Sequence, residues 1–274
     1  MYERGEIMNK YSIFGIFRAF PVTLIIFGTL LCIPAHAAGG AYSWYCVHRK
    51  DHLRPEIGSD ISWVREYDGY YLDPECSNEK TPRDMVLYLT FDVGYENGNV
   101  AKILDVLKSE DVPAAFFVLS HVIEKETALV QRMFDEGHLV CNHTAHHKDM
   151  SKITEEGEFK RELESLEVLC LEKTGHSMAK LYRPPEGRFN RENLVCAKKM
   201  GFRTIFWSFA YADWDNTKQA APEMAFKKIM DNVHNGAILL LHPTSATNAA
   251  ILKDVIRECR ARGYRFESLD ALPA

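Results

Sequence analysis

Residues 86–98 read Val-Leu-Tyr-Leu-Thr-Phe-Asp-Val-Gly-Tyr-Glu-Asn-Gly, and a helix-length amphipathic segment follows them. Short apolar runs alternate with such segments from Met85 onward. Strands that alternate with helices predict a parallel sheet, either closed or open. The expected strands and helices are, in order, Val86–Phe91, Val100–Lys108, Ala114–Leu119, Leu129–Glu136, His138–Asn142, Glu158–Thr174, Lys180–Tyr182, Arg191–Met200, Thr204–Trp207, Glu223–Val233, Ala237–Leu241, Ala249–Arg262 and Arg265–Glu267.

The composition is that of a globular protein with a sizeable core. The chain has 274 residues, of which 46% are apolar and 26% are charged. Its 33 Lys and Arg residues stand against 38 Asp and Glu residues, for a formal net charge of −5. Binding to a nucleic-acid backbone depends on clustered Lys and Arg, so the charge argues against a nucleic-acid partner.

The first 37 residues have the layout of a secretory signal. Lys10 and Arg18 precede the apolar run Val22–Ile33, and the small-residue stretch Ala35–Ala38 follows. This run of about 12 residues is shorter than the roughly 18 to 20 residues of a helix that spans a bilayer. We expect cleavage after Ala37 and export; retention as an N-terminal membrane anchor is the alternative.

Two further regions follow the signal segment. Residues 38–84 are rich in Tyr, charge and turn residues and predict an irregular N-terminal extension, whereas residues 85–274 form the main domain. Without residues 1–37 the chain has six cysteines. Cys46 and Cys76, both in the polar extension, are the candidates for a disulfide, and the others lie in apolar segments typical of a core.

Unusual polar residues follow the predicted strands. In a parallel α/β barrel the catalytic residues lie at the carboxyl ends of the strands. This chain places polar residues at five such ends, namely Asp92, His143, Arg183, Asp213 with Trp214, and His242.

Each of these residues also has a purely structural interpretation. Asp92 could cap a helix, and the Pro-Pro that follows Arg183 could form a rigid turn. His143 and His147 have the i, i+4 spacing that brings two imidazoles together on one helical turn, a common arrangement for Zn²⁺, although two solvent-facing histidines would read the same. His242 could be a hydrogen-bonded core histidine.

Taken together, the motifs resemble the polysaccharide deacetylases of the NodB-homology type. The resemblance runs from about Val86 to Leu269, and the segment 90–98 with 68–72 upstream resembles the delta-lactam-biosynthetic de-N-acetylase branch. That branch acts on N-acetylmuramic acid in spore-cortex peptidoglycan. The resemblance implies a distorted (β/α) barrel and metal-assisted N-deacetylation. Its motifs are Thr90-Phe91-Asp92-Val93-Gly94, His143-Thr144-Ala145-His146-His147, Arg183-Pro184-Pro185, Asp213-Trp214 and Leu240-Leu241-His242.

The resemblance also implies roles in proton transfer. Asp92 would be the general base that activates water, with Arg183 orienting it. His242 would protonate the departing amine, with Asp213 orienting it.

Metal and substrate roles are implied in the same way. His143 and His147 would bind a divalent metal, zinc by expectation. The family usually has a second Asp where this chain has Val93, so the metal site is atypical and its third ligand is open. Trp214 and Leu240 would wall the acetyl pocket, and the backbone N–H after Pro185 would hold the oxyanion. That N–H belongs to Glu186, which stands where the family usually has Tyr.

We therefore expect an exported peptidoglycan N-deacetylase of the cell wall or spore cortex. Its partner would be the peptidoglycan glycan strand, with no membrane partner beyond an N-terminal anchor. The expected substrate is N-acetylmuramic acid on the way to muramic delta-lactam. The alternatives are an N-acetylglucosamine or chitin-type deacetylase, and a non-catalytic glycan-binding barrel.

Overall fold

The computed structural model describes residues 40–273. Within them the strands are β1 (Tyr42–Ser43), β2 (Gly69–Tyr70), β3 (Val86–Val93), β4 (Ala114–Val118), β5 (Leu139–Asn142), β6 (Ala179–Tyr182), β7 (Arg188–Phe189), β8 (Arg203–Ile205), β9 (Ala237–Leu241) and β10 (Arg265–Phe266). The α-helices are α1 (Val100–Glu110), α2 (Ser120–Lys125), α3 (Thr127–Asp135), α4 (Glu156–Thr174), α5 (Arg191–Lys199), α6 (Pro222–Asn232) and α7 (Ala246–Ala261). Short 3₁₀ helices are η1 (Ser62–Tyr67), η2 (Met150–Lys152), η3 (Pro185–Gly187) and η4 (Leu269–Ala271). The predicted alternation is confirmed; the six-residue α2 is too short to show a period and was not predicted.

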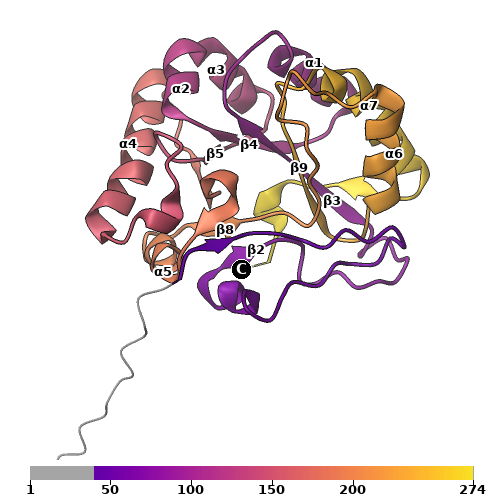
Figure 1. The fold of residues 1–274 in the computed structure, drawn as a ribbon. Coiled ribbons are helices and arrows are strands. Elements are labelled where there is room, and N and C mark those ends of the chain that lie inside the picture. The colour runs from indigo at the N-terminus through magenta and orange to yellow at the C-terminus, as the bar shows by residue number, and fades with distance from the viewer. Residues whose placement is uncertain (1–39, 274) are drawn as a thin grey trace, which may run out of the picture. The chain divides into compact units, whose positions relative to one another are not determined.

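The parallel strands form an irregularly closed barrel. The sheet order is β10-β3-β4-β5-β6-β8-β2, and β9 also pairs with β3. The ring closes where Phe209, beyond the end of β8, bridges Leu239 of β9. There Ser208 N–H donates to Ile238 O at 3.0 Å, and Leu240 N–H donates to Phe209 O at 2.9 Å. Because only these few bonds close the ring, the barrel is irregular. The predicted distorted (β/α) barrel is therefore confirmed, and its helices lie around a central set of strands (Figure 1).

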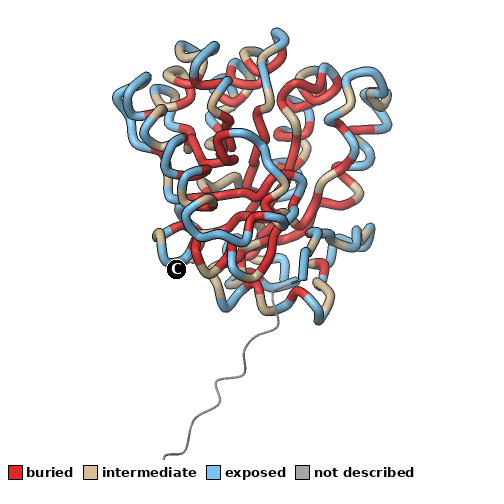
Figure 2. Tube along the Cα trace, turned by 60° about the vertical axis from the view of Figure 1, so that its left-hand side comes forward, coloured by how far each residue is buried: buried red, intermediate tan, exposed pale blue. Residues whose placement is uncertain are grey.

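Side chains of β3 alternate between the barrel interior and the surface that faces the helices. Val86 and Tyr88 belong to the interior cluster, whereas Phe91 and Val93 belong to the large cluster shared with the helices. This alternation is the period of a strand, and it turns Asp92 inward at the end of β3. Burial is accordingly concentrated along the strands and the inner faces of the helices (Figure 2).

The N-terminal extension is mostly irregular, as predicted, but its short strand β2 joins the edge of the barrel sheet. β2 pairs in parallel with β8, and Thr204 N–H donates to Asp68 O at 2.9 Å. A third apolar cluster joins Trp44 and Val64 of the extension to Phe206 of the barrel. A two-residue strand has no detectable period, which is why the sequence predicted only irregular structure here.

Two other predictions concern the extension and the signal segment. Cys46 and Cys76, the candidates for a disulfide, are both unpaired thiols, so this candidate pair is not bonded. The signal segment, residues 1–37, lies outside the described residues. From residue 40 to residue 273, no helix has the length and apolar character needed to cross a membrane.

Candidate active site

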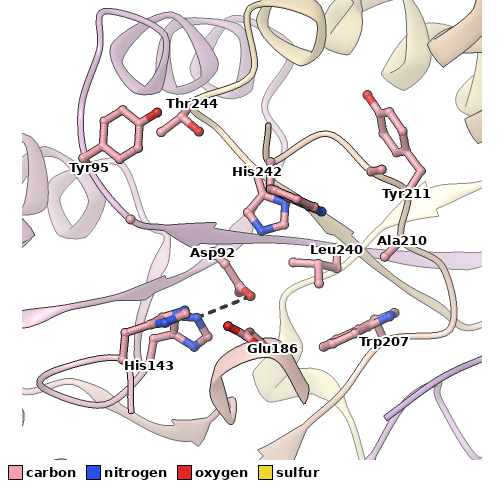
Figure 3. A pocket seen from close by; sticks show the side chains of 14 residues that line it. Asp92, Tyr95, His143, Glu186, Trp207, Ala210, Tyr211, Leu240, His242 and Thr244 are labelled. Atoms are coloured by element: carbon pink, nitrogen blue, oxygen red, sulfur yellow. Dashed lines mark ion pairs between the residues drawn. The ribbon is translucent and has the colours of Figure 1, made fainter. Parts of the chain in front are cut away.

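A cavity of about 730 Å³ lies at the carboxyl ends of the barrel strands. Figure 3 shows its side chains, which come from strands far apart in the sequence. The predicted residues that line it are Asp92, His143, His147, Glu186, Trp214, Leu240 and His242. The other predicted site residues, Arg183, Asp213 and Pro185, do not line the cavity and are buried.

Arg183 binds Asp92 behind the cavity. Its Nη1 donates to Asp92 Oδ1 at 2.7 Å, its Nη2 donates to Thr90 Oγ1 at 2.9 Å, and its Nε donates to Ile205 O at 3.0 Å. The guanidinium also lies over the ring of Phe117, 4.1 Å from the ring centroid. Arg183 is 0% exposed, so it can act only through Asp92 and the strands around it.

The Asp92 carboxylate is ionised in this setting. Burial opposes ionisation, but the charge and the hydrogen bond of Arg183, together with the charge of protonated His242, outweigh it, so the pKa of Asp92 lies below its usual value. One carboxylate oxygen, Oδ1, is held by Arg183; the other, Oδ2, lies 3.6 Å from Nε2 of His143. Asp92 thus offers a charged oxygen to the cavity at neutral pH.

His143 is held as a neutral imidazole with a defined tautomer. Its Nδ1 lies 2.8 Å from Arg183 O, and a carbonyl can only accept, so Nδ1 carries the proton and donates. Nε2 therefore presents a lone pair towards Asp92 and the cavity. Burial, together with the nearby His147, lowers the pKa of His143 to about 4, although Asp92 opposes this shift.

The segment from His143 to His147 is a loop, which corrects the prediction of a helical turn. Thr144 and His147 have φ values of 70° and 55°, which a helix does not contain. Hydrogen bonds to side chains stabilise the loop, since Asn142 Oδ1 accepts Thr144 N–H at 2.9 Å and Thr144 Oγ1 accepts His147 N–H at 3.0 Å. The two imidazoles still meet, with ring centroids 5.2 Å apart. His146 turns away and binds Glu162 of α4.

His242 and Asp213 form a second pair at the cavity. Nδ1 of His242 lies 2.7 Å from Asp213 Oδ1, and the backbone N–H of His242 donates to Asp213 Oδ2 at 2.8 Å. A carboxylate accepts, so Nδ1 of His242 carries a proton and Nε2 is the atom that titrates towards the cavity. Burial lowers the pKa of His242, but the bond to Asp213 and the charges of Asp213 and Asp92 raise it more, so the net shift is upward. Figure 3 shows His242 and His143 on two sides of Asp92.

The predicted substrate residues occupy different positions on the cavity wall. Leu240 is buried on the wall, whereas Trp214 is 64% exposed and lies at the rim. Glu186 lines the cavity with φ 55° and binds Arg188. A side chain on Gly187, at φ 67°, would collide with Trp44 and Trp207. The turn after β6 can therefore approach the indoles only because residue 187 is glycine.

Sequence reasoning missed several lining residues. Trp207, Tyr211, Tyr95 and Thr244 also face the cavity. Trp207 and Tyr211 stand beyond β8, in the irregular segment that closes the barrel. Trp207 ends the predicted strand 204–207 and Tyr211 follows it, and this place was the available signal, because the loops at that end of every strand meet at one site.

The two imidazoles at the cavity are partial ligands for a divalent metal. His143 is neutral with a free Nε2, which is the ligand form of imidazole, and His147 lies beside it. Val93 is completely buried in the cluster shared with the helices and does not line the cavity. Among residues 40–273, no group of three His, Cys, Asp or Glu side chains is placed to hold a metal ion. The two imidazoles fit a metal, and no third protein ligand accompanies them in that range.

Comparison with known proteins gives consistent similarities. The sequence profile described as polysaccharide deacetylase matches residues 79–205. An uncharacterized 30.6 kDa protein of Geobacillus stearothermophilus is 38% identical over 250 residues, which cover 91% of each chain. The peptidoglycan-N-acetylmuramic acid deacetylase PdaA of Bacillus subtilis is 36% identical over 255 residues, which cover 89% of this chain and 94% of the relative. The solved structure of Bacillus subtilis PdaA, described as a family 4 carbohydrate esterase, matches with a TM-score of 0.78 over 85% of this chain and 96% of that chain.

Proposed function

This chain belongs to the polysaccharide deacetylase family, and from that premise we propose that it hydrolyses the N-acetyl groups of peptidoglycan amino sugars, with N-acetylmuramic acid as its substrate. The observation that carries the proposal is a separate base and acid at one cavity. An ionised carboxylate, Asp92, and an imidazole of raised pKa, His242, both line it. The choice of sugar is supported by the relative named for N-acetylmuramic acid, which aligns over nearly its whole length.

Asp92 acts as the general base. Amide hydrolysis requires that the attacking water lose a proton, and the accepting group must be ionised and within reach. Arg183 fixes Oδ1, so the proton is taken by Oδ2, the oxygen on the His143 side. Arg183 is a positioning residue, because it is buried behind Asp92 and touches no open space.

His242 acts as the general acid. The amine that leaves the acetyl carbon is a poor leaving group until it is protonated. Because Nδ1 of His242 is bound by Asp213, the transferable proton is the one on Nε2. Asp213 raises the pKa of His242, so a larger share of the imidazole is protonated at neutral pH. Asp213 is therefore the positioning residue of the acid.

His143 and His147 would hold the divalent metal, and we propose zinc. When bound, the metal supplies polarisation of the acetyl carbonyl. The bond from His143 Nδ1 to Arg183 O fixes the ligand tautomer, and the bond from the backbone N–H of His147 to Thr144 Oγ1 stabilises the loop that carries the second imidazole.

The remaining cavity residues position the acetyl group. Leu240 offers an apolar contact for the methyl group, with Trp207 near it (Figure 3) and Trp214 at the rim. The backbone N–H of Glu186, the residue after Pro185, would donate to the oxyanion. The positive φ of Glu186 belongs to the turn that carries this peptide to the cavity.

We also propose that the protein is exported and works in the cell wall or spore cortex region. The support is the signal-like sequence of residues 1–37 and the location of peptidoglycan outside the cytoplasm. Exported protein should begin at Ala38 on N-terminal sequencing. Membrane-bound protein that still carries Met1 would indicate instead that the segment is retained as an anchor.

The substrate proposal is tested on defined glycans. The purified protein is incubated with peptidoglycan fragments with and without stem peptides, and with chitin oligosaccharides as the comparison. Mass spectrometry of the fragmented products identifies the sugar that loses acetyl. Loss from N-acetylmuramic acid is expected. Loss only from N-acetylglucosamine would change the substrate, and binding without any loss would favour a non-catalytic glycan-binding barrel.

A further inference from the structure

Asn248, in the first turn of α7, makes hydrogen bonds to both members of the Asp213–His242 pair. Its Nδ2 donates to Asp213 Oδ2 at 2.6 Å and to the backbone O of His242 at 3.1 Å. Asn248 is 1% exposed, so bulk water does not compete for these bonds. Its amide thus binds the carboxylate that holds the imidazole.

Two neighbours fix the orientation of this amide. The carboxylate of Asp213 can only accept, so the NH₂ group of Asn248 must face it. The hydroxyl of Tyr211, a cavity residue, donates to Oδ1 on the other side of the amide. Ser245 caps α7 by accepting the backbone N–H of Asn248 at 3.0 Å. Asn248 is therefore held by the helix start and by a side chain of the site.

We propose that Asn248 is a positioning residue for the general acid, an inference that rests on the role of His242 in the proposed function. Its amide keeps Asp213 in the geometry that orients His242. It also stabilises the negative charge of Asp213 by hydrogen bonding and so limits the attraction of that carboxylate for the imidazole proton.

The effect on proton affinity has a definite sign. The amide stabilises the Asp213 carboxylate most when His242 is neutral, because no imidazolium then shares the charge. Removal of the amide therefore favours protonated His242. The charged groups that face this imidazole are Asp213 on the loop after β8, Asp92 on β3 and Arg183 after β6, and none of them changes when Asn248 is replaced.

The test is a titration of His242 by NMR in the full chain with ¹⁵N-labelled histidine, without substrate. Asn248→Leu keeps a similar side-chain volume and removes the amide donor. The double variant Tyr211→Phe/Asn248→Leu also removes the Tyr211 hydroxyl, which would have no acceptor once the Asn248 amide is gone. His242→Ala assigns the resonance. We expect the pKa of His242 to rise by about half a unit in both variants. The alkaline limb of kcat/KM should move upward by the same amount while kcat falls.

Thr247→Val is the matched control. It removes the bond from Thr247 Oγ1 to Ala220 O in the same turn of α7 but leaves the contacts of the Asn248 amide, so Tm should fall without a change in the pKa of His242. An unchanged pKa in folded Asn248→Leu would overturn the proposal. If that variant does not fold, Tyr211→Phe decides: it frees the amide to rotate and should give a smaller upward shift, and no shift would overturn the proposal. Since the titration needs no turnover, a shifted pKa in a protein that deacetylates nothing would contradict the proposed function alone.

Discussion

Arg183 donates to Asp92 from a position with no solvent exposure, across a distance of 2.7 Å between Nη1 and Oδ1. The same guanidinium binds Thr90 Oγ1 and the carbonyls of Ile205 and Phe206, so it links β3 to the chain at and after β8. The ion pair that keeps the base ionised is therefore also a structural link across the barrel.

Replacement of Arg183 should destabilise the fold. Arg183→Met leaves Asp92 as an unpaired buried charge, which typically costs about 3–5 kcal/mol of the free energy of unfolding. Arg188→Met is the control, because Arg188 pairs with Asp149 and Glu186 at an exposed site where solvent screens the charges. Urea unfolding measures both variants. Equal losses would contradict the structural role of Arg183.

Activity should fall as the pH rises through the pKa of His242. The pKa of His242 in the folded protein lies above the unfolded value of about 6.5. Protonation of His242 therefore stabilises the folded state fully at a pH below about 6.5, and this stabilisation is lost as the pH rises through the folded pKa. The protonated form is the acid, so kcat/KM has its alkaline limb there. Asp213→Asn should shift this limb to lower pH, whereas Asp215→Asn, in the same loop, should leave it in place. A limb unmoved by Asp213→Asn would remove Asp213 from this role.

Divalent-metal binding should depend on two histidines and not on the one between them. His143→Ala and His147→Ala should abolish the heat of zinc binding in calorimetric titration, and His146→Ala should retain it because His146 binds Glu162. Binding by the parent should be weak, since Val93 supplies no carboxylate. Undiminished binding by His143→Ala, or none by the parent, would refute the two-histidine site.

Leu240 should limit the size of the acyl group. Leu240→Ala enlarges the acyl pocket. The ratio of kcat/KM for an N-propionyl sugar to kcat/KM for an N-acetyl sugar should therefore rise about tenfold or more, as expected for one methylene in an apolar pocket. A ratio is measured because losses of folded protein cancel in it. An unchanged ratio would place the acyl methyl elsewhere in the cavity.

The sequence located the chemistry because parallel strands end at one edge. Asp92, His143 and His242 each follow a strand, so the shared edge alone brought them together. The period of two along β3 also explains why Asp92 faces the cavity while Val93 faces the helices.

The parts that were missed depend on loop conformation and on long-range contacts. A helical turn was expected after His143, but Thr144 adopts a positive φ that is stabilised by the Asn142 side chain, and nothing in the i, i+4 spacing indicates this. The roles of Asn248 and Trp207 arise from contacts between residues far apart in the chain. Periodicity carries no information about such contacts.

The most direct test of the account is acetate release from peptidoglycan fragments by the parent protein, Asp92→Asn and His242→Ala, side by side and with folding checked by circular dichroism. Each proton transfer typically contributes about 10²–10⁴-fold to the rate of the reaction. The parent should release acetate, and each folded variant should release it more slowly by a factor of that size. Near-parent release by either folded variant would contradict the assignment of base and acid.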